Sequence, residues 1–445
     1  MAAPLTASPI APSRHAQMVT RASFDVAIIS LVGAALRYTT QIMLARWMSS
    51  AEYGIYAYAW AWNAQLVPIV LIGLNAALLR FVPEYVAGGE ADRLSGILSG
   101  GARIVAAWGT VLGCVAAGIA AAVAAPRFAP PLELALVCLP VSALVLFYTD
   151  SLRALYQARW AFGSQLLRPL GVLIGAFWVA RVGHLDATSC AACAVAATTA
   201  VTATGWMITW RSLPGELRAR TRVYDLATWL RVGVPIGLAT YFSGVVGEIG
   251  IVWVGHLCGP RQAGLYSAAS KTAGLTSIAV VAANALAAPV FAALSVQKKR
   301  DEMQQVVGRL AHILFWPSLL VGTGLVVAGP FVLGLFGRDF RAAAPALALL
   351  VAGEVAGTGA GSVANLLQMT GHQDHVGYVL GGCALMAAVL SPIFIRFWGI
   401  NGAALASSFS FVTWKYIMHY RVVSTLGVNP SILHALRTLK RSHAA

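Results

Sequence analysis

The chain has 445 residues, of which 58% are hydrophobic and 11% charged, and its formal net charge is +15. A soluble globular protein carries about 25% charged residues, so this composition and a mean hydropathy of +0.74 exclude that class. Apolar stretches long enough to cross a bilayer, roughly 20 residues each, recur along the chain and predict an all-α polytopic membrane protein.

The apolar stretches predict about twelve membrane-spanning helices joined by short connections. Residues 1–20 are polar, and the first apolar stretch is too long for a signal peptide, so we expect a flexible cytoplasmic tail there. No connection is long enough to hold a soluble catalytic domain. In chain order the expected spans cover approximately residues 24–46, 54–79, 98–125, 131–152, 163–182, 187–210, 230–255, 264–290, 306–330, 342–367, 376–398 and 400–422.

The basic residues are distributed unevenly between the two sides of the membrane. Most of the 31 Lys and Arg residues fall on the side of the N-terminus, and we count Arg168 and Lys415 among them. Such an excess marks the cytoplasmic side, so both termini are expected in the cytoplasm. Membrane topology therefore explains the basic charge, and no nucleic-acid partner is expected.

The cysteines give little indication of metal or redox chemistry. Cys190 and Cys193 have a C-x-x-C spacing, but small apolar residues surround them and no histidine or charge flanks them. Packing of small residues between helices explains them better than a metal site. We expect no metal and no cofactor.

A short motif recurs in the two halves of the chain. The stretch "ARWMSSAEYGIYAYA" at 45–59 is echoed by "GHLCGPRQAGLYSAA" at 255–269, each in the outward turn between the first two helices of a half. An even number of spans per repeat gives both halves the same orientation and relates them by an axis along the membrane normal. We expect two pseudo-symmetric six-helix lobes around a central cleft. The predicted divisions are a tail (1–20), an N-terminal lobe (21–211), a basic linker (212–229), a C-terminal lobe (230–424) and a basic cytoplasmic tail (425–445).

The stretch "FDVAIISLVGAALRYTTQIMLARWMSSAEYGIYAYA", followed by "LIGLNAALLRFVPEY", resembles the start of the polysaccharide transporters. These belong to the multidrug/oligosaccharidyl-lipid/polysaccharide (MOP) exporter superfamily. In the second half, "AGLYSAASKTAGL" and "ANLLQMTGHQDH" are similar to the same family. The resemblance implies export of lipid-linked sugars across the bacterial inner membrane. The implied partners are a lipid-linked oligosaccharide, membrane lipids, and a polysaccharide polymerase with glycosyltransferases; a proton or sodium ion is a further candidate.

Four charged residues are expected near the bilayer centre within their spans: Arg37, Glu248, Lys271 and Glu354. Such charges are costly in a bilayer and usually face a cavity or a partner. Lys271 is expected either to pair with Glu248 or Glu354 or to contact substrate. For Arg37 we expect a water-filled cavity and contact with a diphosphate or acidic sugar, which a guanidinium can bind in bidentate geometry. The alternative for Arg37 is an ion pair between the lobes with Glu248 or Glu354.

Further substrate-binding candidates lie along the second span. Arg80 is placed to meet a lipid-diphosphate headgroup at the inner face, or to act as a positive-inside anchor. Trp60 and Trp62 could stack on sugar rings or face lipid. Asn63 could bind sugar hydroxyls or join helices.

Candidates for coupling and gating lie in several spans. Asp25 could titrate in an ion-coupled cycle or simply stabilise the start of its helix, and Glu248 and Glu354 could also couple. Pro235 and Gly237 belong to a glycine-rich span that could bend as a gate, although glycines also permit close packing.

The sequence therefore predicts a flippase for a polyprenyl-diphosphate-linked oligosaccharide that works by alternating access, and not an enzyme. The first alternative is a multidrug exporter of the same superfamily. A cleft for cationic drugs should carry more acids than bases at mid-depth, whereas here two bases match two acids. A membrane glycan polymerase or ligase is the second, but no long outward loop is present to carry its chemistry.

Overall fold

The computed structural model describes residues 12–213, 221–297 and 299–436, and all regular structure in these ranges is helical. The N-terminal half contains α1 (Pro12–Trp47), α2 (Ser50–Leu71), α3 (Leu74–Gly88), α4 (Ala91–Val123), α5 (Ala129–Val137), α6 (Leu139–Ala154), α7 (Ala158–Val182) and α8 (Ala187–Ser212). The C-terminal half contains α9 (Leu226–Cys258), α10 (Pro260–Ala273), η2 (Gly274–Ser277), α11 (Ile278–Val296), α12 (Arg300–Val327), α13 (Gly329–Gly334), η3 (Arg338–Ala343), α14 (Ala344–Thr358), α15 (Val363–Met369) and α16 (Gln373–Leu426).

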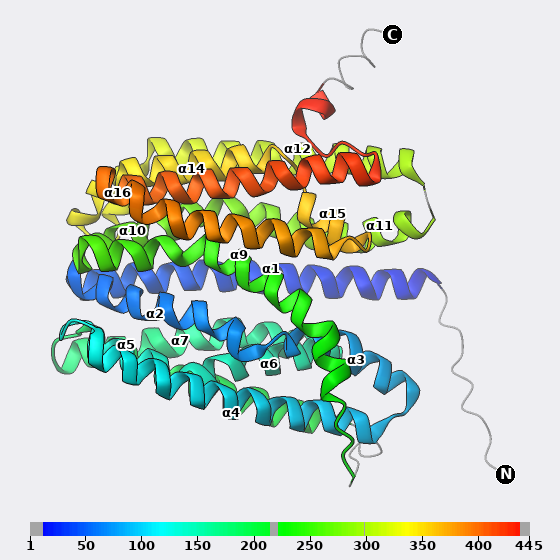
Figure 1. Cartoon of the computed structure of the whole chain (residues 1–445), viewed down its shortest axis with the longest axis horizontal. Coiled ribbons are helices and arrows are strands. Elements are labelled where there is room, and N and C mark those ends of the chain that lie inside the picture. Colours follow the sequence, from blue (N-terminus) through cyan, green and yellow to red (C-terminus); the bar gives the residue numbers. More distant parts are fainter. Residues whose placement is uncertain (1–11, 214–220, 298, 437–445) are drawn as a thin grey trace.

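The helices form two groups that lie side by side (Figure 1). Helices α2 to α8 make one group and α10 to α16 the other, while α1 runs between them and α9 crosses from one to the other. Accordingly, α1 packs on α7 and also touches α10 and α11, whereas α9 packs on α16, α2 and α3. The expected all-α polytopic membrane fold built of two helical groups is confirmed.

Seven helices in the described part are long and apolar enough to cross a membrane, or nine if each of two bent pairs forms one span. The pairs are α2 with α3, bent by 45°, and α5 with α6, bent by 41°. Helix α16 counts as one span in this number. A straight helix of its 54 residues would extend about 80 Å, far more than the roughly 30 Å of a bilayer core, and Gly399, with φ 55°, interrupts it. The number of twelve spans stays a prediction.

The ends of the expected divisions differ in detail from the helix boundaries. Helix α1 begins at Pro12 and so includes part of the expected tail; proline suits the first turn of a helix. Residues 1–11, residues 214–220 of the expected linker and residues 437–445 of the C-terminal tail lie outside the described residues. The lobe boundaries themselves stay predictions.

The two groups share an apolar core at one end of the bundle. We call the end where α1 finishes and α2 begins the outer end, and the opposite end the inner end. At the outer end one cluster of buried side chains contains both Tyr53 of α2 and Phe336, which follows α13. At the inner end, in the described residues, the cluster around Phe147 is separate from the one around Phe291. The inner end of α9 is nevertheless fixed to the first group, because Trp229 Nε1 donates a 3.1 Å hydrogen bond to the Tyr85 hydroxyl.

Candidate functional site

At the outer end, α2 and α10 cross with their backbones in contact at the two glycines of the sequence repeat. A Cβ atom on Gly54 would lie 1.8 Å from the carbonyl oxygen of Pro260. A Cβ atom on Gly264 would lie 2.4 Å from the Ser50 carbonyl oxygen and 3.2 Å from Gly54 Cα. Only glycine at both positions allows this approach of the two halves.

An aromatic cluster lies beside this crossing. Tyr38 and Tyr53 come from the N-terminal half, and Phe336 and Phe340 from the C-terminal half. The ring centroids of Tyr38 and Phe336 are 5.7 Å apart, and those of Tyr53 and Phe340 are 5.8 Å apart. The hydroxyls of Tyr38 and Thr272 also form a 3.0 Å hydrogen bond across the boundary. We call these five residues the outer seal; both phenylalanines are fully buried in it.

Polar contacts join the two halves around the outer seal. Ser50 donates a 3.1 Å hydrogen bond to Asp339, which also forms a 3.4 Å ion pair with Arg261. Arg46 Nε donates to the carbonyl oxygen of Leu335 at 2.6 Å. The groups of this rim are exposed, so each contact contributes little to stability. The hydrogen bonds from Ser50 to Asp339 and from Arg46 to Leu335 cross between the halves and must break if the halves separate there.

A cation–aromatic cluster lies within the N-terminal half. The guanidinium of Arg168 lies 5.3 Å from the centroid of the Trp60 ring, a distance at which the cation and the ring attract each other. Trp60 in turn stacks on Tyr56 at 5.8 Å with an interplanar angle of 17°. Arg168 was counted with the cytoplasmic cations, and this assignment is wrong: it lies ten residues into α7, roughly 15 Å along the helix. The cluster combines a phosphate-binding group with the flat face of an indole.

The two basic residues that the sequence suggested for this half, Arg37 and Arg80, lie in other helices than this cluster. Arg37 lies in α1 and is exposed, next to Tyr38 of the outer seal. Arg80 lies in α3, is also exposed, and has its guanidinium 5.5 Å from the Phe81 ring centroid. Contact of either arginine with substrate stays a prediction, as does a pair of Arg37 with an acid of the other half. Asp25 lies in α1, but its side chain is outside the described part.

Asn63 and Trp62 are placed mainly by helix packing. Asn63 is 3% exposed, and its Nδ2 donates a 2.6 Å hydrogen bond to the carbonyl oxygen of Ala135. This bond joins α2 to α5 and favours the alternative in which Asn63 links helices. Trp62 is half-buried and packs against the core clusters of both the outer and inner ends.

The C-terminal half contains a partly open cavity of about 130 Å³ between α9, α10, α14 and α16. Its wall carries several hydroxyl groups, including those of Tyr266 and Ser407, which hydrogen-bond to each other at 3.0 Å. Glu354 is the acidic group in the wall, and its carboxylate accepts a 2.9 Å hydrogen bond from Ser277.

The cation associated with Glu354 is Lys415, which interacts with it electrostatically. Lys415 is 8% exposed, and its Nζ lies 4.6 Å from the Trp414 ring centroid and 5.6 Å from that of Phe411. We counted Lys415 with the cytoplasmic cations, and this assignment is wrong. The two aromatic faces and the carboxylate together offset part of the cost of burying an ammonium group.

The expected ion pair of Lys271 with an acid of its own half is not formed in the part of the chain that the structure describes. Among the described residues, no ion pair within 4.0 Å joins Lys271 to Glu248 or Glu354. Lys271 is half-buried, one residue before Thr272 of the outer seal. Glu248 is half-buried in α9, and its charge acts on the hydroxyl of Tyr53 across the boundary between the halves. Contact of Lys271 with substrate and coupling through Glu248 stay predictions.

The glycines of α9 divide into two classes. A Cβ atom on Gly237 would lie 2.6 Å from Gly73 Cα, so this glycine permits close packing of α9 against the break between α2 and α3. By contrast, a Cβ atom on Gly244 or Gly247 would have nothing within 4 Å. Pro235 lies inside α9 without ending it. Packing therefore explains Gly237, and a gating role for Pro235 and Gly237 stays a prediction.

Sequence reasoning missed two charged residues of these sites, Arg168 and Lys415. Both lie inside stretches that the hydropathy pattern assigned to the membrane. Measuring their depth from the end of each stretch, rather than assigning them to the nearer loop, would have placed them with the four intramembrane charges.

Comparison with known proteins identifies the fold and one family. Residues 21–295 match the model of a family described as polysaccharide biosynthesis protein. No curated protein matches the chain. Among solved structures, one described as the inward-facing conformation of a multidrug resistance MATE family transporter of the MOP superfamily has a TM-score of 0.77 at 12% identity; the match covers 90% of this chain and 98% of that one.

Two other solved structures are also similar. An outward-facing multidrug resistance MATE family transporter of the MOP superfamily has a TM-score of 0.66 at 11% identity and coverages of 91% and 95%. A MOP superfamily transporter from Pyrococcus furiosus, described as having a binding pocket of reverse polarity, has a TM-score of 0.61 at 11% identity and the same coverages. At these identities the likeness shows the fold alone.

Proposed function

The chain belongs to the polysaccharide biosynthesis protein family and is a multi-pass membrane transporter of the MOP superfamily, and on this premise we propose that it flips a polyprenyl-diphosphate-linked oligosaccharide, or a related polysaccharide precursor, across the bacterial inner membrane. We assign the inner end of the bundle, where α1 begins, to the cytoplasm because most Lys and Arg residues lie there, and we expect both termini on that side. The headgroup crosses between the two halves while the polyprenyl tail remains in lipid.

The observation that carries this proposal is the position of Arg168 over Trp60 at mid-depth. A diphosphate presents several anionic oxygens, and a guanidinium binds them through paired, charge-assisted hydrogen bonds. The indole face offers an apolar surface to a sugar ring. Arg37, Arg80 and Lys271 add positive charge for the same headgroup.

A cationic drug is a poorer fit to the same surface. Arg168 already occupies one side of Trp60, which is the group that would attract an organic cation. The pairing of Arg168 with Trp60 thus favours an anionic substrate over the multidrug alternative. We further propose that the chain itself is a transporter without enzymatic activity that receives its substrate from glycosyltransferases and delivers it to a polymerase.

Alternating access requires the outer seal to open. The two halves meet there through Gly54 and Gly264, two aromatic pairs and a hydrogen bond, whereas their inner core clusters are separate. This arrangement supports an inward-facing state that receives the headgroup from the cytoplasmic leaflet. The higher similarity to an inward-facing than to an outward-facing relative is consistent with it.

The cavity in the C-terminal half is the proposed coupling site. Glu354 and Lys415 carry opposite charges in a buried setting and act on each other electrostatically, and Ser277 donates a hydrogen bond to the Glu354 carboxylate. Binding of a proton or sodium ion at Glu354 would change the charge of this site. Glu248, with its charge near Tyr53, would transmit that change to the outer seal.

The experiment is a complementation assay in cells that lack the gene. We expect lipid-linked oligosaccharide to accumulate facing the cytoplasm, and the wild-type protein to remove it. Arg168→Gln should fail to do so. Arg181→Gln is the matched control, because Arg181 makes a similar cation–aromatic contact with Phe177 at 5.0 Å in the same helix. Absence of accumulation, or full complementation by Arg168→Gln, would contradict the proposal.

A further inference from the structure

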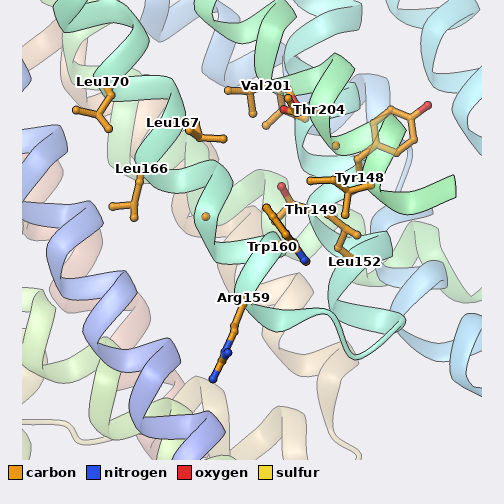
Figure 2. A pocket seen from close by; sticks show the side chains of 14 residues that line it. Tyr148, Thr149, Leu152, Arg159, Trp160, Leu166, Leu167, Leu170, Val201 and Thr204 are labelled. Atoms are coloured by element: carbon orange, nitrogen blue, oxygen red, sulfur yellow. The ribbon is translucent and has the colours of Figure 1, made fainter. Parts of the chain in front are cut away.

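A second cavity, of about 550 Å³, lies at the inner end of the N-terminal half between α6, α7 and α8 (Figure 2). This volume is within the range of sites that bind small ligands, about 300–1,000 Å³. Most of its wall is apolar; the exceptions are Tyr148, Thr149, Arg159 and Thr204. We call it the α7 groove.

The groove is open toward the surroundings of the protein. Trp160 and Leu167 in its wall are 56% and 50% exposed. Exposed apolar side chains on a membrane-spanning helix meet lipid chains rather than water. Open space adjoins Gly163 in the wall of the groove, since a Cβ atom there would have nothing within 4 Å.

A positive charge lies at the inner rim of the groove. Arg159 is in the first turn of α7, next to Trp160, and extends away from the apolar wall formed by Leu167 and Leu170 (Figure 2). Basic groups at the cytoplasmic ends of pockets between membrane helices attract anionic lipid headgroups. Trp160 is of the type that is enriched at the membrane interface.

The dimensions of the groove correspond to one leaflet. The wall from Trp160 to Leu170 covers about ten residues of helix, roughly 15 Å, and the hydrocarbon core of one leaflet is half of about 30 Å. A lipid chain in the groove would thus place its phosphate at the level of Arg159.

We propose that the α7 groove binds one acyl chain of an anionic phospholipid, with the lipid phosphate at Arg159. The tail of the transported lipid is not the favoured occupant, because its diphosphate must reach Arg168, nine residues deeper and so roughly 13 Å away along α7. Leu167 and Leu170, which line the groove, also lie on a different face of the helix from Arg168. The bound phospholipid fills the space that the three helices leave between them.

The test uses the full-length protein in nanodiscs of equal amounts of phosphatidylglycerol and phosphatidylcholine, followed by native mass spectrometry of the lipids retained. Wild-type protein should retain one phosphatidylglycerol molecule in preference to phosphatidylcholine. Arg159→Gln should reduce this preference about tenfold or more, since charge-assisted hydrogen bonds are lost. Gly163→Phe, which fills the groove, should remove the retained lipid, and Gly163→Leu serves if the larger variant does not fold.

Two variants act as controls. Gly118→Phe adds the same side chain where Gly118 also has open space, in α4, and Arg93→Gln removes a charge from an exposed pair with Glu90. Both should retain the lipid as the wild type does. Equal retention of the two lipids by the wild type, or wild-type retention in Arg159→Gln or Gly163→Phe, would overturn the proposal. It would also be overturned if polyprenyl phosphate displaced the retained lipid from wild-type protein and from Gly118→Phe alike, because the groove would then hold the tail of the transported lipid.

Discussion

Gly54 and Gly264 touch across the boundary between the two halves, and they occupy equivalent positions in the sequence repeat. A glycine at only one of the positions would not suffice, because each lacks space for a Cβ atom. The repeat therefore marks the place where the two pseudo-symmetric halves close on each other.

Substitution of Gly54 by valine should open the outer seal. Overpacking costs about 1–3 kcal/mol, and each 1.4 kcal/mol shifts an equilibrium tenfold, so the closed state should lose population about 5- to 140-fold. The measurement is labelling of Ser267→Cys, a buried position in α10, by an impermeant maleimide in a background without the six native cysteines. Gly118→Val is the control, and unchanged labelling in Gly54→Val would show that this contact does not hold the seal closed.

Lys415 and Glu354 should depend on each other for stability. Removing one member of a buried pair leaves the other charge uncompensated and costs about 3–5 kcal/mol, so Lys415→Met should lower the unfolding temperature strongly. Combining it with Glu354→Gln should recover most of the loss, which a double-mutant cycle of thermal unfolding in detergent would measure. Lys271→Met, at a half-buried lysine, should have a smaller effect. Strictly additive effects of the two substitutions would mean that the two groups do not interact.

The two classes of glycine in α9 should behave differently. Gly237→Ala puts a methyl group against Gly73 and should cost about 1–3 kcal/mol of stability. Gly244→Ala meets no neighbour, and alanine favours a helix by about 0.5–1 kcal/mol over glycine. If α9 bends during transport, Gly244→Ala and Pro235→Ala should slow transport while stability is kept. Wild-type transport rates in both variants would exclude bending at these residues.

Arg37 tests whether the first helix contributes to substrate binding. Arg37→Ala should reduce flipping about 10- to 100-fold through loss of charge-assisted hydrogen bonds, and Arg37→Lys should lie between it and the wild type, because lysine keeps the charge but not the bidentate geometry. Wild-type rates in both would refute the role. Recovery of Arg37→Ala by Glu248→Gln would instead favour the ion pair between the halves.

Composition and charge distribution were sufficient to predict the fold class, and the resemblance of the stretch around residues 24–59 to the polysaccharide transporters indicated the superfamily. The outer seal could not be predicted, because Tyr53 and Phe340 are far apart in the sequence and Phe340 belongs to a short outward segment without helical periodicity. Only the packing of the two halves brings such residues together.

The errors for Arg168 and Lys415 have one physical cause. Long basic side chains near the end of a span usually extend to the membrane surface, and we assigned both to the nearer loop. An indole face for Arg168 and a carboxylate with two aromatic rings for Lys415 allow them to stay inside instead. Those partners come from other helices or from neighbouring turns, so hydropathy alone does not show them.

The most direct test of the account is flipping of a fluorescent polyprenyl-diphosphate oligosaccharide by purified protein in proteoliposomes. The wild type and Arg181→Gln should flip it at the same rate, and Arg168→Gln should be slower by about 10- to 100-fold. Organic cations should compete poorly with this lipid for the protein, since Arg168 occupies one side of Trp60. Equal rates for Arg168→Gln and the wild type, or transport of an organic cation with no flipping of the lipid-linked sugar, would contradict the account.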